Sequence, residues 1–147
     1  MDKKFHIAIF ASGAGSTLQT LIDNQMVYGY NVALVVTNRS CMALERAATH
    51  GIRALQTKDW EAIDIALETE KIDLIVLAGF LAIVPQWICE KWNHRIINIH
   101  PSLLPKHGGK GMYGIHVQES VLAAQDTEAG CTVHYVSAEV DGGGIIA

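Results

Sequence analysis

Three stretches of the chain are apolar at nearly every position rather than at every second one. They are Phe5–Ala11, Asn31–Thr37 (NVALVVT) and Asp73–Phe80 (DLIVLAGF). A strand buried on both faces has this pattern, whereas a strand with one solvated face alternates apolar and polar residues. Segments with helical periodicity separate the three stretches. The sequence therefore predicts a doubly wound α/β fold around a mainly parallel sheet.

The rest of the chain continues the alternation of strand and helix. The expected helices are Ser16–Met26, Ala43–His50, Asp59–Glu70, Pro85–Trp92 and Val117–Ala124. Further strands are expected at Arg53–Gln56, from Arg95 in RIINIH, at Cys131–Ser137, and at the start of GGGIIA. We expect the last two strands to form an antiparallel edge of the sheet.

The length of 147 residues indicates a single domain over residues 1–147, long enough to bury roughly 70% of its unfolded surface. Half of the residues are hydrophobic, which is typical of a folded core. The chain stops at Ala147, where an apolar strand has just begun, so we expect a further C-terminal strand and helices to be missing.

Charge and cysteine content narrow the functional classes. The net charge of −4 gives no long-range attraction for nucleic acid or an anionic membrane, so an anionic ligand must be held by local groups. No apolar run approaches the ~18 residues of a membrane helix, and the N-terminus lacks a signal-peptide pattern. The three cysteines, Cys41, Cys89 and Cys131, are far apart and odd in number, which favours reduced thiols in the cytoplasm.

A glycine-rich turn, ASGAGSTLQ, joins the first strand to the first helix. Such a turn can hold phosphate with backbone N–H groups and the helix dipole. A Walker A loop is excluded because the turn has no lysine. The dinucleotide fingerprint is excluded because Leu18 stands at the third glycine and no acidic residue closes the second strand. Two interpretations stay open: a small phosphate site at Gly15, Ser16 and Thr17, or a tight turn without a ligand.

Polar residues end the strand in RIINIHPSLLP. Asn98 and His100 are two residues apart, so on a strand their side chains share a face. Taken alone they could be a polar pair that caps a strand. Ligands of open α/β sheets, however, bind beyond the carboxyl ends of the strands. The glycine turn, the apolar segment LAGFLAIVP and the Asn98–His100 pair all lie at such ends, which favours a common ligand site.

Two other features are less specific. EVDGGG places Asp141 in a glycine-rich turn, where Asp-Gly is common without any function. The remaining histidines show no recurring ligand spacing, so we expect no metal site. His116 and His134 could line a pocket, although a structural role is the simpler interpretation for both.

The motifs together resemble a known family. IFASGAGSTLQTLID, VVTNRSCMALERAATHGI, DLIVLAGFLAIVP, INIHPSLLPKHGGKG and GCTVHYVSAEVDGGGII are similar to phosphoribosylglycinamide formyltransferases, collinearly over nearly the whole chain. These are folate-dependent enzymes of purine synthesis with a Rossmann-like formyltransferase fold. The resemblance implies formyl transfer from 10-formyltetrahydrofolate, as co-substrate, to the amine of glycinamide ribonucleotide. Both partners are small molecules, and neither nucleic acid nor a membrane is implied.

The resemblance also implies roles for individual residues. The catalytic set would be Asn98, His100 and Asp141, and the substrate phosphate would bind Gly15, Ser16 and Thr17. The folate site would comprise Leu81, Ala82, Ile83, Val84, Asn98, Ser137, Ala138, Glu139, Val140 and Asp141. The family often has Arg at the position of Ala82, where it implies a side-chain contact to folate that an alanine does not offer. It often has Asn at the position of Thr17, which keeps a hydroxyl.

In the mechanism that the resemblance implies, Asn98 and a protonated His100 donate to the formyl oxygen as it becomes negative. Asp141 favours the charged imidazole, because a nearby carboxylate stabilises a cation. Alternatives are a deformylase that passes the formyl group to water, a transferase for another amine, or a non-catalytic module that binds a phosphate or nucleotide.

Overall fold

The first part of the fold is a four-stranded parallel sheet. In a computed structural model, which describes residues 3–147, the chain forms two compact units, divided between Ala82 and Ile83. The strands of the first unit lie in the order β3-β2-β1-β4. Their bounds are Phe5–Ala11 (β1), Tyr30–Thr37 (β2), Arg53–Gln56 (β3) and Leu74–Leu77 (β4). All their pairings are parallel, as the continuous apolar runs predict.

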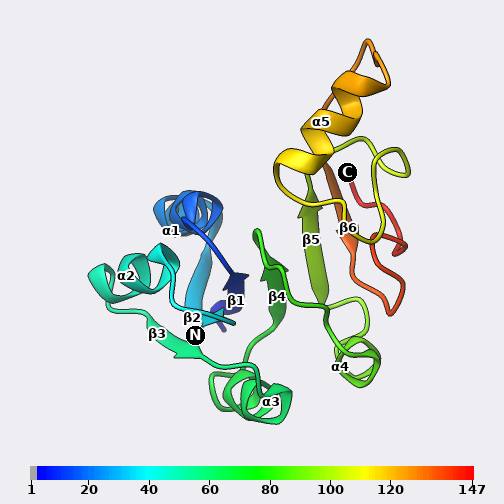
Figure 1. Cartoon of the computed structure of the whole chain (residues 1–147). Coiled ribbons are helices and arrows are strands. Elements are labelled where there is room, and N and C mark those ends of the chain that lie inside the picture. The colour runs from blue at the N-terminus through cyan, green and yellow to red at the C-terminus, as the bar shows by residue number, and fades with distance from the viewer. Residues whose placement is uncertain (1–2) are drawn as a thin grey trace. The chain divides into compact units, whose positions relative to one another are not determined.

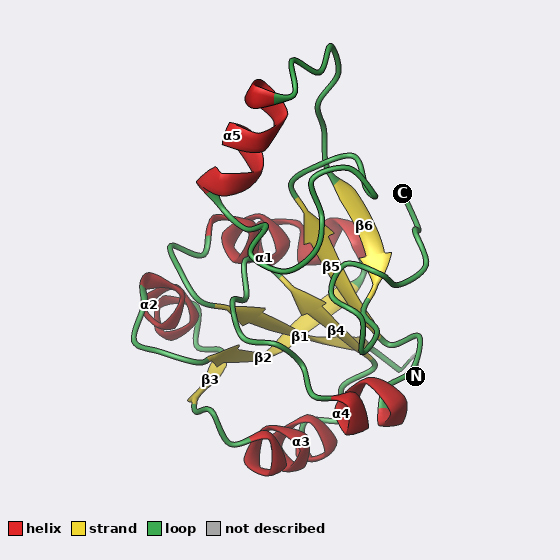
Figure 2. Cartoon of the chain, turned by 45° about the vertical axis from the view of Figure 1, so that its right-hand side comes forward, coloured by secondary structure: helices red, strands yellow, loops and turns green. Residues whose placement is uncertain are grey.

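Three helices cover this sheet. They are α1 (Ser16–Tyr28), α2 (Met42–Thr49) and α3 (Trp60–Thr69). Figure 2 shows α1 and α2 on one side of the strands and α3 on the other. Because both faces are covered, Ile9, Leu34 and Val35 on the central strands are fully buried. This double covering explains why β1 and β2 are apolar without alternation.

An aromatic cluster packs between the sheet and α3 in the first unit. The ring of Phe10 on β1 lies 5.3 Å from that of Phe80 and 6.2 Å from that of Trp60, measured between ring centroids. The Phe80 and Trp60 rings meet edge to face at 6.1 Å. Edge-to-face contacts align the positive edge of one ring with the negative face of another. The cluster fixes the segment after β4 against the sheet.

The second unit contains an antiparallel strand pair and two helices. Its elements are α4 (Gln86–Lys91), β5 (Ile96–His100), α5 (Ile115–Ala123) and β6 (Thr132–Tyr135), which Figure 1 labels. Strands β5 and β6 pair so that Asn98 lies opposite His134 and His100 opposite Thr132. This pairing places the polar residues of the two strands side by side.

The α/β class, the mainly parallel arrangement and the antiparallel edge are confirmed, but β5 and β6 form this edge rather than the two last predicted strands. Some boundaries differ. The predicted strand Asp73–Phe80 extends only over Leu74–Leu77, because the Asp73 carboxylate instead accepts from the His6 N–H and Gly79 turns the chain at a φ of 70°. The strand expected in GGGIIA is reduced to a single bridge between Ile145 and His134. The single domain over residues 1–147 stays a prediction.

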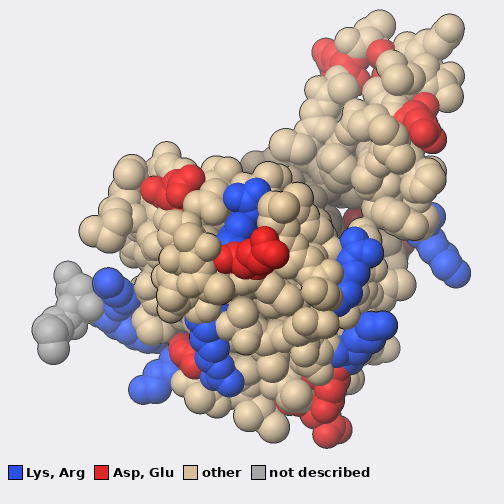
Figure 3. Space-filling view, turned by 60° about the vertical axis from the view of Figure 1, so that its left-hand side comes forward, with Lys and Arg blue, Asp and Glu red and all other residues tan. Residues whose placement is uncertain are grey.

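Figure 3 shows the charged side chains on one face of the molecule. On the face drawn in Figure 3, Lys and Arg side chains lie apart from one another among neutral and acidic residues. None of the helices described between residues 3 and 147 has the length and apolar character needed to cross a bilayer.

Helix α3 supplies a direct test of local structure. The Asp59 carboxylate precedes the helix and accepts hydrogen bonds from the Glu61 and Ala62 N–H groups, at 3.0 and 3.5 Å. Asp59→Ala removes both acceptors, so we expect the free energy of unfolding to fall by about 1 kcal/mol. Denaturant unfolding followed by circular dichroism measures the change. Asp59→Ser, which keeps an acceptor, should retain most of the stability, and equal losses in both variants would contradict the capping role.

Candidate active site

The glycine turn of the first unit ends at the N-terminus of α1. Gly15 occupies the N-cap position with a φ of 74°, and no side chain caps the helix. The first-turn N–H groups of an uncapped helix have no intrahelical acceptor, and the helix dipole makes this end positive. The predicted phosphate residues Ser16 and Thr17 are the first two residues of this helix, and Ser16 is exposed.

The carbonyl groups of the same turn are all engaged. The Ser12 carbonyl accepts from the Arg39 guanidinium at 2.7 Å, and the Ala14 carbonyl from that of Arg46 at 2.7 Å. Between them, the Gly13 carbonyl accepts from the Ala43 N–H at 3.2 Å. These bonds hold the turn against α2 and place two positive charges beside it. An anion at this end of α1 would therefore meet donors and cations held in place before it binds.

Ser12 links the three chain segments that leave the sheet at this end. Its hydroxyl donates to the Asn38 side-chain oxygen at 2.7 Å and accepts from the Leu81 N–H at 2.9 Å. Its own N–H donates to the Gly79 carbonyl at 3.1 Å. The chain runs from β1 outward through β2 and β3 and then returns to β4 on the other side of β1, so a topological switch point lies between β1 and β4. Ligand sites of open α/β sheets occupy such points.

In the second unit, the ring of His100 lies between two hydrogen-bond acceptors. Its Nε2 is 2.9 Å from the carbonyl oxygen of His107, and its Nδ1 is 3.5 Å from a carboxylate oxygen of Asp141. Neither a carbonyl nor a carboxylate can donate a proton, so a ring that satisfies both must carry a proton on each nitrogen. The side chain is only 4% exposed, which keeps competing water away. Both nitrogens of the buried ring therefore face acceptors of the protein.

Asp141 serves two partners at once. One carboxylate oxygen faces His100, and the other accepts a hydrogen bond from the Gly109 N–H at 2.8 Å. Asp141 adopts a left-handed backbone with a φ of 55° in the turn that the Asp-Gly sequence predicts. For a residue other than glycine this conformation is uncommon and is found where surrounding contacts enforce it.

Asn98 completes the group through a second histidine. The Asn98 amide nitrogen is 3.1 Å from His134 Nε2, and His134 Nδ1 donates to the Tyr135 carbonyl at 2.9 Å. His134 Nε2 in turn lies 3.8 Å from the Asp141 carboxylate. His134 is buried, whereas Asn98 is partly exposed. The predicted catalytic residues Asn98, His100 and Asp141 are therefore brought together, with His134 between two of them.

The sequence interpretation underestimated two histidines. His134 is part of the group, and the signal that could have found it is its register on β6, opposite Asn98. His107 supplies the carbonyl that faces His100, which no side-chain pattern reveals. His116, by contrast, is exposed and lies near Glu119 and Tyr113. Within residues 3–147, His, Cys, Asp and Glu side chains form no group of three or more that could hold a metal ion.

The residues expected to contact folate are divided between the two units. Leu81 and Ala82 end the first unit, and Leu81 is 47% exposed. In the second unit Ile83 is exposed but Val84 is buried in the core. The turn Ser137–Val140 is exposed and leads directly into Asp141. Apart from Val84, these residues have accessible surface for a ligand.

Comparison with known proteins identifies the class. The family model described as formyl transferase matches residues 5–147, so the chain belongs to the formyl transferase family. It is 43% identical over 155 residues to a trifunctional purine biosynthetic protein adenosine-3 of Drosophila pseudoobscura pseudoobscura, covering 95% of this chain and 11% of that protein. It is 36% identical to the chloroplastic phosphoribosylglycinamide formyltransferase of Arabidopsis thaliana, covering 96% of this chain and 53% of the relative.

A solved structure is similar over almost the whole chain. The phosphoribosylglycinamide formyltransferase of Anaplasma phagocytophilum superimposes with a TM-score of 0.89 at 36% identity, covering 98% of this chain and 70% of that one. The chain thus spans about a tenth of the fly relative and about half of the Arabidopsis relative.

The glycine turn gives a prediction with a matched control. At Gly15 an added Cβ would lie 3.1 Å from the Ala43 backbone, in a backbone conformation unfavourable to other residues. We expect Gly15→Ala to lower the free energy of unfolding by roughly 1–3 kcal/mol and to weaken binding of a phosphate-bearing ligand. At Gly13 an added Cβ meets no atom within 4 Å, so Gly13→Ala should change both quantities little. Calorimetric titration and chemical denaturation measure the two effects, and equal behaviour of the variants would refute this role for Gly15.

Proposed function

We propose that the protein transfers a formyl group from 10-formyltetrahydrofolate to the primary amine of glycinamide ribonucleotide, a step in purine synthesis. Membership of the formyl transferase family and the similarity to the fly, Arabidopsis and Anaplasma proteins support this reaction. The co-substrate is the reduced folate, and both ligands are small molecules. The cytoplasm is the proposed location.

One observation carries the chemical part of the proposal. The buried ring of His100 faces two acceptors, the Asp141 carboxylate and the His107 carbonyl. A ring that donates to both carries a positive charge. Asn98 precedes His100 by two residues on the same strand, β5, and carries an amide group. A buried cation and an amide donor at the end of a strand suit a reaction in which an oxygen becomes negative.

The amine of the ribonucleotide attacks the formyl carbon, and the carbonyl oxygen gains negative charge as the new C–N bond forms. An Asn98 N–H and the His100 cation stabilise this oxygen. The Nε2–H of His100 keeps its bond to the His107 carbonyl and also donates to this oxygen, as a three-centre hydrogen bond. The amine loses a proton, N10 of the folate gains one, and the C–N10 bond breaks. Asp141 and His100 are the groups placed to carry that proton.

The remaining roles are proposed from the family resemblance. Gly15, Ser16 and Thr17 hold the ribonucleotide phosphate at the N-terminus of α1, where two arginines already brace the turn. Leu81, Ala82, Ile83 and the turn from Ser137 to Val140 contact the folate, largely through the backbone; buried Val84 supports the segment from below.

The reaction is tested by following folate absorbance with and without glycinamide ribonucleotide. We expect the formyl-folate to be consumed only when the ribonucleotide is present, and the formylated ribonucleotide to accumulate in equal amount. Consumption without the ribonucleotide would identify a deformylase instead. Tight nucleotide binding with no folate binding would identify a non-catalytic module.

His100→Ala tests the role of the cation. We expect kcat to fall by about 10²–10³-fold, as when a donor to a developing oxyanion is removed, while the Kd for the ribonucleotide stays nearly unchanged. His116→Ala is the matched control, because His116 is an exposed histidine on α5 that lies outside the group. Unchanged turnover in His100→Ala would remove His100 from the mechanism.

A further inference from the structure

A second cluster of polar side chains holds His107. The Asp126 carboxylate lies 2.7 Å from His107 Nε2, and the Ser120 hydroxyl lies 2.6 Å from Nδ1. Because a carboxylate can only accept, Nε2 donates to Asp126, while Nδ1 shares a hydrogen bond with the Ser120 hydroxyl, a group that can donate or accept. We call these three residues, Ser120, His107 and Asp126, the His107 clamp.

The clamp holds an uncommon backbone conformation. His107 has a φ of 57°, in the left-handed region that side chains other than glycine rarely adopt. Such a residue persists where its surroundings over-determine it, and these positions concentrate at functional sites. Both ring nitrogens of His107 are bonded at short distances, and its side chain is only 11% exposed. The clamp supplies the restraint that this conformation needs.

The restrained backbone makes two hydrogen bonds to the candidate catalytic residues, one to His100 and one to Asp141. The His107 carbonyl accepts from His100 Nε2, and two residues later the Gly109 N–H donates to Asp141. With the contact between His100 and Asp141, these bonds form a closed ring of interactions. The backbone between them lies close to the pair, because a Cβ added at Gly108 would lie 3.5 Å from that of Asp141.

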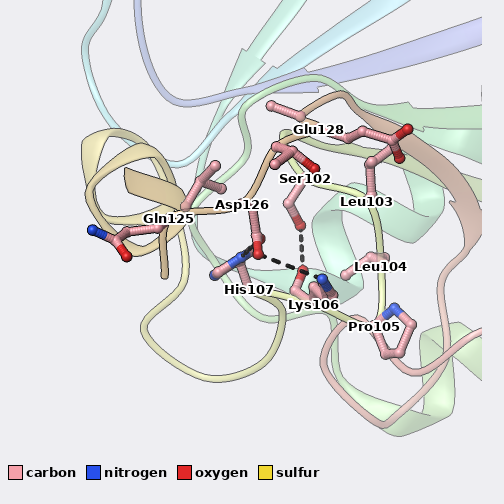
Figure 4. Close-up of a pocket in the computed structure, with 12 residues that line it drawn as sticks. Ser102, Leu103, Leu104, Pro105, Lys106, His107, Gln125, Asp126 and Glu128 are labelled. Carbon is pink, nitrogen blue, oxygen red and sulfur yellow. Dashed lines mark hydrogen bonds and ion pairs between the residues drawn. The ribbon is translucent and has the colours of Figure 1, made fainter. Parts of the chain in front are cut away.

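The clamp borders a cavity of about 450 Å³, shown in Figure 4, in which His107, Asp126 and Lys106 converge. Several of the polar groups there bind one another. Asp126 pairs with His107 and, at 3.5 Å, with Lys106, while Ser102 donates to the Lys106 carbonyl. The hydrogen bond from His107 holds the pKa of Asp126 below its usual range, which keeps it a carboxylate at neutral pH. We therefore interpret this cluster as a set of groups that orients His107, and not as a site for a ligand.

We propose that His107 is a positioning residue for the reaction: anchored by Ser120 and Asp126, it directs its carbonyl to the Nε2–H of His100 and so fixes the orientation of that ring. This inference rests on the proposed function for its catalytic consequence. His107 acts through its backbone, and its imidazole takes no part in formyl transfer.

Asp126→Ala tests the clamp by removing the acceptor of the His107 Nε2–H. We expect kcat for formyl transfer to fall about ten- to a hundredfold with KM for both substrates within twofold, since misplacing a reacting group by about 1 Å can cost a factor of that size. The Nε2–H proton of His100, followed by NMR, should exchange with water at least tenfold faster. Asp126→Asn keeps an acceptor oxygen and should restore part of both signals.

The matched control is Glu119→Ala, which removes a carboxylate that lies 3.9 Å from another histidine, His116, on the exposed face of α5. It should leave kcat and the His100 signal unchanged. Ser120→Ala breaks the clamp at the other nitrogen and serves as the second variant if Asp126→Ala fails to fold. An unchanged or raised kcat together with an unchanged His100 signal in the folded variants would overturn the proposal.

The two proposals can fail separately. If the wild-type protein transfers no formyl group, the proposed function fails, while the His100 exchange rates still decide whether the clamp orients the ring. If transfer occurs and the Asp126 and Ser120 variants behave like Glu119→Ala, only the clamp is refuted.

Discussion

The contact between Asp141 and His100 is the interaction on which the second unit depends. A carboxylate brought beside a nearly buried imidazole is stable only when its remaining lone pairs are also satisfied. The Gly109 N–H meets this requirement, and the His107 carbonyl does the same for the far side of the ring. The strand pair β5–β6, the turn that contains Asp141 and the segment around residues 107–109 therefore stabilise one another. Loss of any one of them would leave a buried polar group without its partner.

Much of this arrangement is predictable from the sequence because it follows from how apolar and polar residues repeat over a few positions. Apolar runs such as that of β2 identify a sheet covered on both faces, and the spacing of Asn98 and His100 places them on one face of a strand. Pairing between distant segments does not follow from such periods. The register that sets His134 opposite Asn98 and the backbone carbonyl of His107 depend on tertiary contacts, so a sequence pattern alone could not reveal them.

The difference between local patterns and tertiary contacts also explains why two predicted strand boundaries were wrong. Asp73 and Gly79 lie in a run that is apolar enough to continue a strand, but the side chain of one and the backbone angle of the other end β4 early. At the C-terminus, GGGIIA has the composition of a strand, yet an added Cβ at Gly143 would lie 1.7 Å from the Tyr135 carbonyl oxygen. Residues 144–147 do hydrogen-bond to Val133 and Tyr135, but only the pair Ile145–His134 forms a bridge.

The bracing of the glycine turn has a kinetic consequence. Binding sites formed by loose loops lose conformational entropy when the ligand arrives, and association slows when ordering must come first. Here the carbonyls of Ser12, Gly13 and Ala14 are bonded to α2 and its flanking arginine, with no ligand needed. An incoming phosphate would find the turn already ordered, so its capture should be governed by diffusion and charge rather than by folding of the turn.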